Sequence, residues 1–163
     1  MKKVDMEKTS LSQWNPDYSS NLDFFDSQNR RLVTIMSQIQ SIYESGSGNF
    51  LPAIKQLIHF LTQKFHEENL AMMIAGYPDR SKHIEEHLAF VTKIDDFLMD
   101  FIISDPDLGH SLLTYLQQWV SEHIAIQDVQ FGQYLNNRTD LKKRVFDLHQ
   151  ELNKPPLLYV VNA

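Results

Sequence analysis

The spacing of the apolar residues constrains the fold of this chain more than any other feature of its sequence. From Asn21 to Ile42, apolar side chains recur at every third or fourth position, as expected of an α-helix that buries one face. The same spacing returns in three later stretches, which are separated by short segments containing glycine or proline. Four long amphipathic helices with short connections are typical of an up-down-up-down four-helix bundle, so we expect an all-α fold.

Turn-forming residues predict where these helices begin and end. The first is expected to stop at residues 45–48, the second to run from a cap at Asn49 to Gly76–Pro78, the third to open at Asp79 or Ser81, and the fourth to open at Asp105–Pro106. Thr139 is expected to cap a short fifth helix that runs to about Leu152, ahead of Pro155–Pro156. The chain is thus divided into an N-terminal arm (1–20), the bundle (21–135), and a C-terminal helix with an apolar tail (136–163) in the same domain.

Composition argues against several classes of protein. The 163 residues are enough for one domain with a core of its own. A formal charge of −6 argues against nucleic acid as a partner, because phosphate binding requires a basic face. The chain has no cysteine, which excludes disulfides and thiolate metal ligands. It has no secretory signal and no apolar run long enough to span a bilayer, so we expect a cytoplasmic protein with no membrane partner.

Histidines and carboxylates at helical spacing predict a metal site. His83 and His87 are four residues apart, so one turn of helix places them on the same face, where both can bind one ion. His123 is followed five residues later by Asp128 on the predicted fourth helix, and Glu68 lies near the end of the second. Three imidazoles and two carboxylates form a typical ligand set for a divalent metal.

From roughly residue 14 to residue 135, the chain resembles the bacterial hemerythrins. The matching motifs are Trp14 with Tyr18, Asp26-Ser27-Gln28-Asn29, Lys64-Phe65-His66-Glu67-Glu68, Tyr77-Pro78, His83-Ile84-Glu85-Glu86-His87, and Trp119 with His123-Ile124 and Asp128. The resemblance implies a bacterial protein with a metal centre inside a four-helix bundle, the fold also found in myohemerythrin.

The resemblance also identifies two departures from the family pattern. Hemerythrins bind two irons through five histidines and two bridging carboxylates. The positions that match retained ligands are those of one iron and of both bridges: His83, His87, His123, Glu68 and Asp128. The two histidines of the other iron, where oxygen binds in the family, are replaced by Asn29 and Lys64. The sequence therefore predicts a degenerate diiron site in which one metal subsite is altered.

Lys64 suggests how the altered subsite can be tolerated. It lies one helical turn before Glu68 and on the same side of the predicted helix. An ammonium group donates hydrogen bonds and has no lone pair for a metal, but it can neutralise Glu68, Asp128 or both. Burying two carboxylates without a compensating charge is costly. Our hypothesis is that Lys64 replaces the second metal and that Asn29 is its neutral hydrogen-bonding neighbour.

These observations predict one divalent metal ion as the cofactor. The resemblance favours iron, and zinc, manganese or cobalt are also compatible with the ligand set. The favoured function is metal binding or sensing, with oxygen as a candidate small ligand and without conventional diiron oxygen carriage. The alternatives left open are a mononuclear iron enzyme that activates oxygen or peroxide, a metal-free interaction module, and a diiron oxygen-binding protein with substitute ligands. No residue is assigned a catalytic role.

The remaining expectations concern packing and assembly. A core is predicted to include Met72, Met73, Phe65, Phe90 and Phe97. The residues at helical spacing on the predicted fourth helix are Leu112, Leu116, Trp119, His123, Ile126 and Phe131. The other histidines, at positions 59, 66, 110 and 149, are expected at the surface or its boundary. The apolar residues 157–161 would pack onto the bundle or join two chains, so either a monomer or a homodimer through this tail is expected.

Overall fold

The structure is a computed structural model that describes residues 14–46, 51–102 and 108–154, and every regular element in these ranges is helical. The elements in chain order are the 3-10 turn η1 (Pro16–Tyr18), α1 (Asp23–Glu44), α2 (Leu51–Ala75), α3 (Arg80–Ile102), α4 (Leu108–Glu122), the π-helical segment η2 (His123–Asp128), α5 (Val129–Asn136) and α6 (Thr139–Leu152). Because α4, η2 and α5 follow one another without a break, they form a single long rod.

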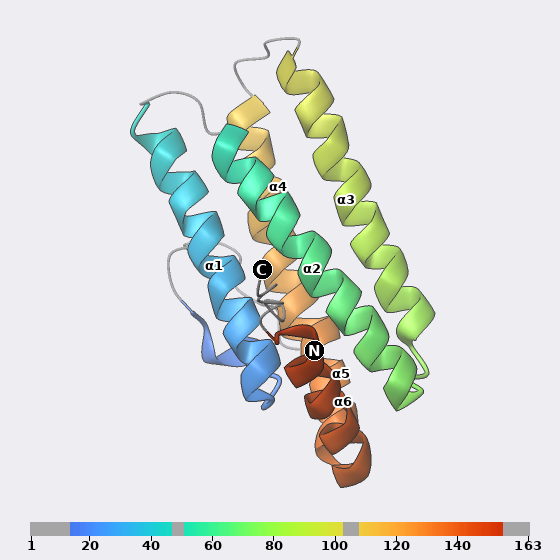
Figure 1. Cartoon of the computed structure of the whole chain (residues 1–163). Coiled ribbons are helices and arrows are strands. Elements are labelled where there is room, and N and C mark those ends of the chain that lie inside the picture. Colours follow the sequence, from blue (N-terminus) through green and yellow to red (C-terminus); the bar gives the residue numbers. More distant parts are fainter. Residues whose placement is uncertain (1–13, 47–50, 103–107, 155–163) are drawn as a thin grey trace, which may run out of the picture.

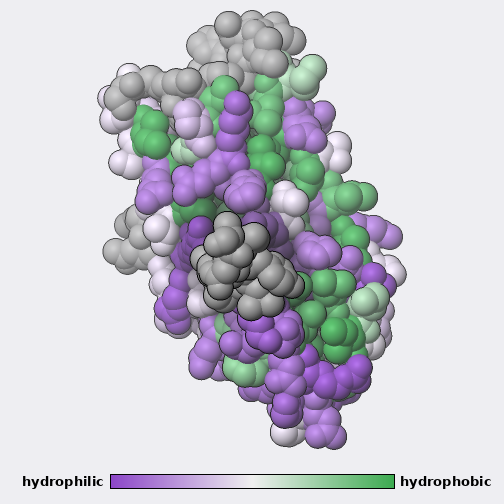
Figure 2. Space-filling model, viewed as in Figure 1, coloured by the Kyte–Doolittle hydropathy of each residue, from purple (hydrophilic) through white to green (hydrophobic). Residues whose placement is uncertain are grey.

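The first three helices and this rod form the four-helix bundle that the apolar spacing predicts (Figure 1). α1 packs against α2 and α4, and α3 packs against the same two helices from the other side. The short helix α6 lies outside the bundle, where it contacts α2 and α5. None of the described helices is long and apolar enough to cross a membrane. Hydrophilic and hydrophobic residues are interspersed over the face in Figure 2, as expected for amphipathic helices.

The corner between α2 and α3 confirms the stop predicted at Gly76. This glycine adopts φ +61°, a left-handed conformation that most side chains disfavour. Its N–H donates to the carbonyl of Met73 (3.2 Å), and the N–H of Tyr77 donates to the carbonyl of Met72 (3.0 Å). This pair of hydrogen bonds is a Schellman motif, which satisfies the last carbonyls of a helix. Pro78 then follows, and α3 begins two residues later at Arg80.

Some expectations about single residues are wrong. Met73 is 53% exposed, because the adjacent Met72 faces the interior and one residue turns a helix by about 100°. Ile126 is 48% exposed, because the π-helical geometry of η2 turns it toward solvent. Thr139 is the first residue of α6, and Arg138 occupies the cap position. The predictions for Asn49, Asp105–Pro106, Pro155–Pro156 and the 157–161 tail lie outside the described residues.

Two hydrophobic clusters fill the bundle. One contains buried residues from the C-terminal part of α1, most of α2 up to Phe65, α3 from Phe90 onward, and α4. The other contains residues from the start of α1, the end of α2, the α2–α3 corner, α5 and α6. Each of the four long rods carries buried polar side chains near the level at which the two clusters meet.

Glu67 and His149 attach α6 to the bundle. The Glu67 carboxylate, which is only 7% exposed, pairs with Nδ1 of His149 and accepts a hydrogen bond from Gln28 (2.7 Å). The His149 ring also stacks on Phe24, with ring centroids 5.0 Å apart. His149 is therefore an anchor between α6, α2 and α1, a contact that its position in the sequence gave no reason to expect.

A close approach at Gly132 holds the segment before α1 against α5. The carbonyl of Ser20 accepts a hydrogen bond from Asn136 (3.0 Å), and Ser20 donates through its N–H and its hydroxyl to the Asp26 carboxylate (2.7 Å each). A Cβ atom added at Gly132 would lie 2.4 Å from the Ser20 carbonyl oxygen. Because the obstruction is backbone atoms, this crossing requires glycine.

We expect Gly132→Ala to lower the free energy of unfolding by about 1–3 kcal/mol, the usual cost of overpacking a well-packed site. This would occur even though alanine favours an isolated helix over glycine by roughly 0.5–1 kcal/mol. Chemical denaturation of the variant and the parent protein measures the difference. A variant as stable as the parent would show that the Ser20 crossing moves at no cost.

Candidate metal centre

A band of buried polar side chains crosses the bundle between the two hydrophobic clusters. It contains Asn29 from α1, Lys64 and Glu68 from α2, His83 and His87 from α3, and His123 and Asp128 from η2. Each of these seven residues is at most 4% exposed. Contacts connect six of the seven positions that the sequence singled out, and the seventh, Asn29, is buried on α1.

The three imidazoles converge on one point. The Nε2 atoms of His87 and His123 are 2.9 Å apart. The Oδ1 atom of Asp128 lies 3.5 Å from Nε2 of His83 and 3.3 Å from Nε2 of His123. On the other side, Oε2 of Glu68 lies 3.5 Å from Nε2 of His87. One ligand atom from each of the three histidines and from Asp128 lies within 4.8 Å of the others.

These separations fit one bound metal ion. Metal–nitrogen and metal–oxygen bonds to zinc-like ions are about 2.0–2.2 Å, so neighbouring ligand atoms on one ion lie roughly 3.0–3.5 Å apart. The oxygens Oε2 of Glu68 and Oδ1 of Asp128, and both ring nitrogens of His83, are buried without a hydrogen-bond partner. Buried polar atoms are rarely left unpartnered, so the two carboxylate oxygens beside Nε2 of the imidazoles indicate a place for a cation.

The π-helical geometry of η2 is what places His123 and Asp128 on the same side. In a regular α-helix, two residues five positions apart differ in direction by about 140°. In η2 the hydrogen bonds instead span five residues, and the N–H of Val129 donates to the carbonyl of Ile124. Both side chains therefore point inward, and Ile126 is turned toward solvent. π-helical turns are rare and often occur at functional sites.

The two carboxylates divide their oxygens between the histidines and Lys64. The Lys64 ammonium forms ion pairs with Oε1 of Glu68 and with Oδ2 of Asp128, the latter at 3.0 Å. The remaining oxygen of each carboxylate faces the histidines. Each carboxylate thus bridges the ammonium group and the site at which the three imidazoles converge.

The buried charges of the band are centred on Lys64, whose ammonium group lies between the carboxylates of Glu68 and Asp128. Burial would lower the pKa of Lys64, but the charges of Asp128 and Glu68 hold that pKa above its ordinary value. Burial acts to raise the pKa of Asp128, yet the charges of Lys64 and His123 keep it well below its usual range. Burial lowers the pKa of His87, so this imidazole is neutral and has a lone pair for a metal.

Asn29 does not make the hydrogen bond expected of it. It is completely buried, and neither its amide oxygen nor its amide nitrogen has a hydrogen-bond partner. The hypothesis that Asn29 hydrogen-bonds to Lys64 is therefore not supported by the contacts. His59, His66 and His110 are exposed, so no other histidine supplies a ligand to this band.

Sequence reasoning missed the residues that surround the histidines. Nδ1 of His123 lies 3.2 Å from the Glu86 carboxylate. The hydrogen bond from this imidazole lowers the pKa of Glu86 below its ordinary value. The Trp119 ring stacks on His123 (centroids 4.3 Å apart), and the Phe65 ring stacks on His87 (3.7 Å). The only signal for Glu86 was its place beside His87, which does not reveal the direction of its side chain.

The family model described as "Hemerythrin HHE cation binding domain" matches residues 20–135. The chain is also similar to proteins called bacteriohemerythrin. It is 24% identical to that of Stenotrophomonas maltophilia over 123 residues, which cover 73% of this chain and 78% of the relative. It is 23% identical to that of Clostridium acetobutylicum over 124 residues, covering 72% and 96%. It is 26% identical to that of Ralstonia nicotianae over 103 residues, covering 61% and 73%.

Proposed function

Because this chain belongs to the hemerythrin HHE cation-binding family, we propose that it is a metal-binding protein with a single divalent ion in its core. The ligands would be His83, His87 and His123 with the inner oxygens of Glu68 and Asp128. The observation that carries the proposal is the convergence of the three imidazoles and Asp128, with Oδ1 of Asp128 and Oε2 of Glu68 buried beside Nε2 of the histidines without a hydrogen-bond partner. A divalent cation would satisfy this group of atoms, and the imidazole and carboxylate types suit iron, zinc, manganese or cobalt.

The second part of the proposal concerns Lys64. Its ammonium pairs with the outer oxygen of each carboxylate and is the cation that balances these atoms. A second metal ion would have to bind the same two oxygens and would be repelled by the ammonium. The chain would therefore act as a mononuclear metal protein in binding or sensing, and it would lack conventional diiron oxygen carriage.

A bound ion would act as a Lewis acid and, if it is iron, as a one-electron redox centre. The protein's own residues supply the rest of the environment. Phe65 and Trp119 stack on His87 and His123, and this apolar contact limits the access of water to both imidazoles. Burial acts to raise the pKa of Asp128, but the charge of Lys64 holds it well below its usual range, so this carboxylate is ionised and ready to bind. At Glu68, burial and the charge of Asp128 outweigh Lys64, and the pKa stays above its ordinary value.

The test is the metal content of untagged protein, measured by elemental analysis with and without reconstitution by Fe(II) or Zn(II). We expect about one ion per chain, as follows from a single set of converging ligands. About two ions per chain would contradict the role of Lys64 and restore the diiron alternative. No ion after reconstitution would favour the metal-free interaction module.

Substitution of one ligand localises the ion. His87→Ala should reduce the metal content to less than about 0.1 ion per chain and should abolish the rise in melting temperature on adding metal, because a ligand that binds only the folded state stabilises it. His66→Ala is the matched control: it removes an exposed histidine of α2 that faces away from the band. Equal metal loss in both variants would contradict the assignment.

A further inference from the structure

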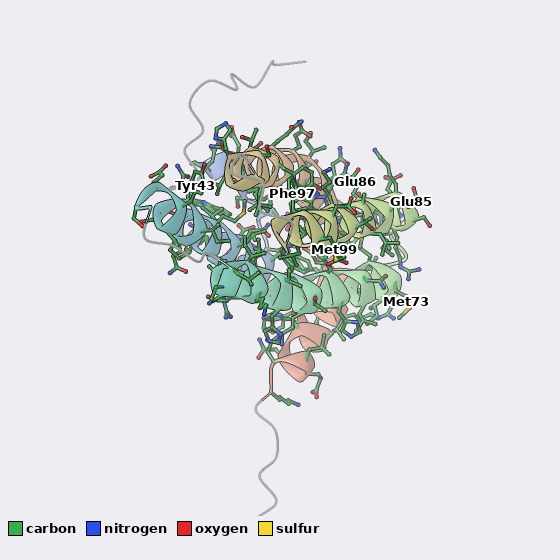
Figure 3. The ribbon with its side chains drawn as sticks, turned by 90° about the horizontal axis from the view of Figure 1, so that it is seen from above. Tyr43, Met73, Glu85, Glu86, Phe97 and Met99 are labelled. Atoms are coloured by element: carbon green, nitrogen blue, oxygen red, sulfur yellow. The ribbon has the colours of Figure 1, made fainter. Side chains whose placement is uncertain are left out.

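Glu86 contacts the π-helical segment at two points. One carboxylate oxygen, Oε2, lies 3.2 Å from Nδ1 of His123. The other, Oε1, accepts a hydrogen bond from the side-chain amide of Gln127 (2.8 Å). In Figure 3, Glu86 lies on the side of α3 that faces α4, and Glu85 lies farther from α4. One side chain of α3 therefore binds two residues of η2 that are four positions apart.

The contact with His123 fixes which ring nitrogen carries the hydrogen. An ionised carboxylate can only accept hydrogen bonds, so Nδ1 of His123 must be the donor. In the neutral imidazole, the lone pair is then on Nε2, the atom that faces His87 and Asp128. Among the described residues, His83 has no such support, because its Nδ1 atom is buried without a partner.

The contact with Gln127 acts on the backbone of the same segment. Gln127 immediately precedes Asp128, and the residue is 9% exposed. Since η2 departs from the regular helical register, it needs contacts that favour the wider turn over the α-helical one. By binding a residue near each end of η2, Glu86 stabilises the register in which both His123 and Asp128 point inward.

We propose that Glu86 is a positioning residue for this site: from outside the ligand set, it orients His123 with Nε2 toward the centre and holds the π-helical register of η2. Its predicted effect on metal affinity rests on the proposed function, whereas its effect on the His123 ring does not. The chemistry of metal sites in general supports the effect on metal affinity. Replacing a carboxylate that accepts from a metal-binding histidine commonly weakens metal binding by about 10- to 100-fold.

The position of Glu86 makes the inference testable by substitution. Its side chain is 33% exposed and borders a surface hollow of about 310 Å³ that is also lined by Trp119, Glu122 and His123. Truncation therefore leaves no sealed cavity in the core. Glu85 provides the matched control, because it is the adjacent residue of α3, carries the same charge and is exposed.

The experiment compares Glu86→Ala, Glu86→Gln and Glu85→Ala with the parent protein by two readouts. The first is nitrogen NMR of the histidine rings in the metal-free proteins, which distinguishes the two neutral tautomers. The spectra are recorded at alkaline pH, where His123 is neutral, because burial lowers its pKa but Asp128 and Glu86 raise it above its ordinary value. The parent protein and Glu85→Ala should hold the hydrogen of His123 on Nδ1, whereas Glu86→Ala should show a mixture of tautomers. Glu86→Gln should retain most of the parent signal, because its amide oxygen can still accept from Nδ1.

The second readout is the affinity for Zn(II), measured by competition with a chelator. Glu86→Ala should bind Zn(II) about 10- to 100-fold more weakly than the parent, Glu86→Gln less so, and Glu85→Ala within twofold. An unchanged tautomer and affinity in Glu86→Ala would overturn the inference, as would an equal loss in Glu85→Ala. If the parent binds neither Zn(II) nor Fe(II), the proposed function fails, and the NMR comparison still decides whether Glu86 positions His123.

Discussion

Replacing Lys64 by methionine should lower the free energy of unfolding of the metal-free protein by about 3–5 kcal/mol, the usual effect of removing one partner from a buried ion pair. Lys64 is 1% exposed, and its ammonium contacts both Glu68 and Asp128. Methionine has a similar length and fills a similar space, so the variant removes the charge without leaving a large cavity. Two carboxylates would then remain buried with no cation bound to their outer oxygens.

The same variant should be more sensitive to alkaline than to acidic conditions. Burial and the charge of Asp128 already raise the pKa of Glu68 above its ordinary value of 4.5. A carboxyl group with a raised pKa in the folded state destabilises the fold once the pH exceeds the pKa of the unfolded chain. The deficit of Lys64→Met relative to the parent should therefore be greater at pH 8 than at pH 5.

Chemical denaturation of chelator-treated protein at both pH values measures these differences. Lys55→Met is the matched control, because Lys55 lies on the same helix and is exposed, so its replacement should change stability by less than about 0.5 kcal/mol. A Lys64→Met variant as stable as the parent would contradict the idea that Lys64 compensates the charge of the two carboxylates.

The paired substitution Asn29→His and Lys64→His should raise the metal content from about one to about two ions per chain. Removal of the ammonium frees Oε1 of Glu68 and Oδ2 of Asp128, the oxygens that face away from the three histidines. The two new imidazoles come from α1 and α2 at the level of the same polar band. Two imidazoles and two carboxylate oxygens are sufficient ligands for a second divalent ion.

The single variants serve as controls for this experiment. Asn29→His alone should stay at one ion, because Lys64 still pairs with both outer oxygens. Lys64→His alone should bind a second ion more weakly than the double variant, since it supplies one new ligand instead of two. Elemental analysis and the rise in melting temperature with added metal measure both effects. A double variant that still binds one ion would show that the subsite was lost for other reasons.

Much of the fold follows from local features of the sequence. The apolar spacing predicts the helices because it records which side of each segment is buried, and the glycine at position 76 marks a corner because it adopts a left-handed conformation. The identity of the candidate ligands also follows from the sequence, because His83 and His87 are separated by one helical turn and Glu68 and Lys64 by another. These relations hold within single helices and need no knowledge of packing.

The contacts between helices and the π-helical register of η2 could not be predicted from the sequence. The five-residue separation of His123 and Asp128 is compatible with a shared direction only in a π-helical turn, and this turn is stabilised by Glu86 from another helix. The same limit applies to Glu67, whose partner His149 is 82 residues away. The sequence by itself determined the helices and the types of ligand, because these depend on short-range periodicity. The tertiary structure decided which carboxylate oxygen faces Lys64 and which faces the histidines, because that depends on how separate helices pack.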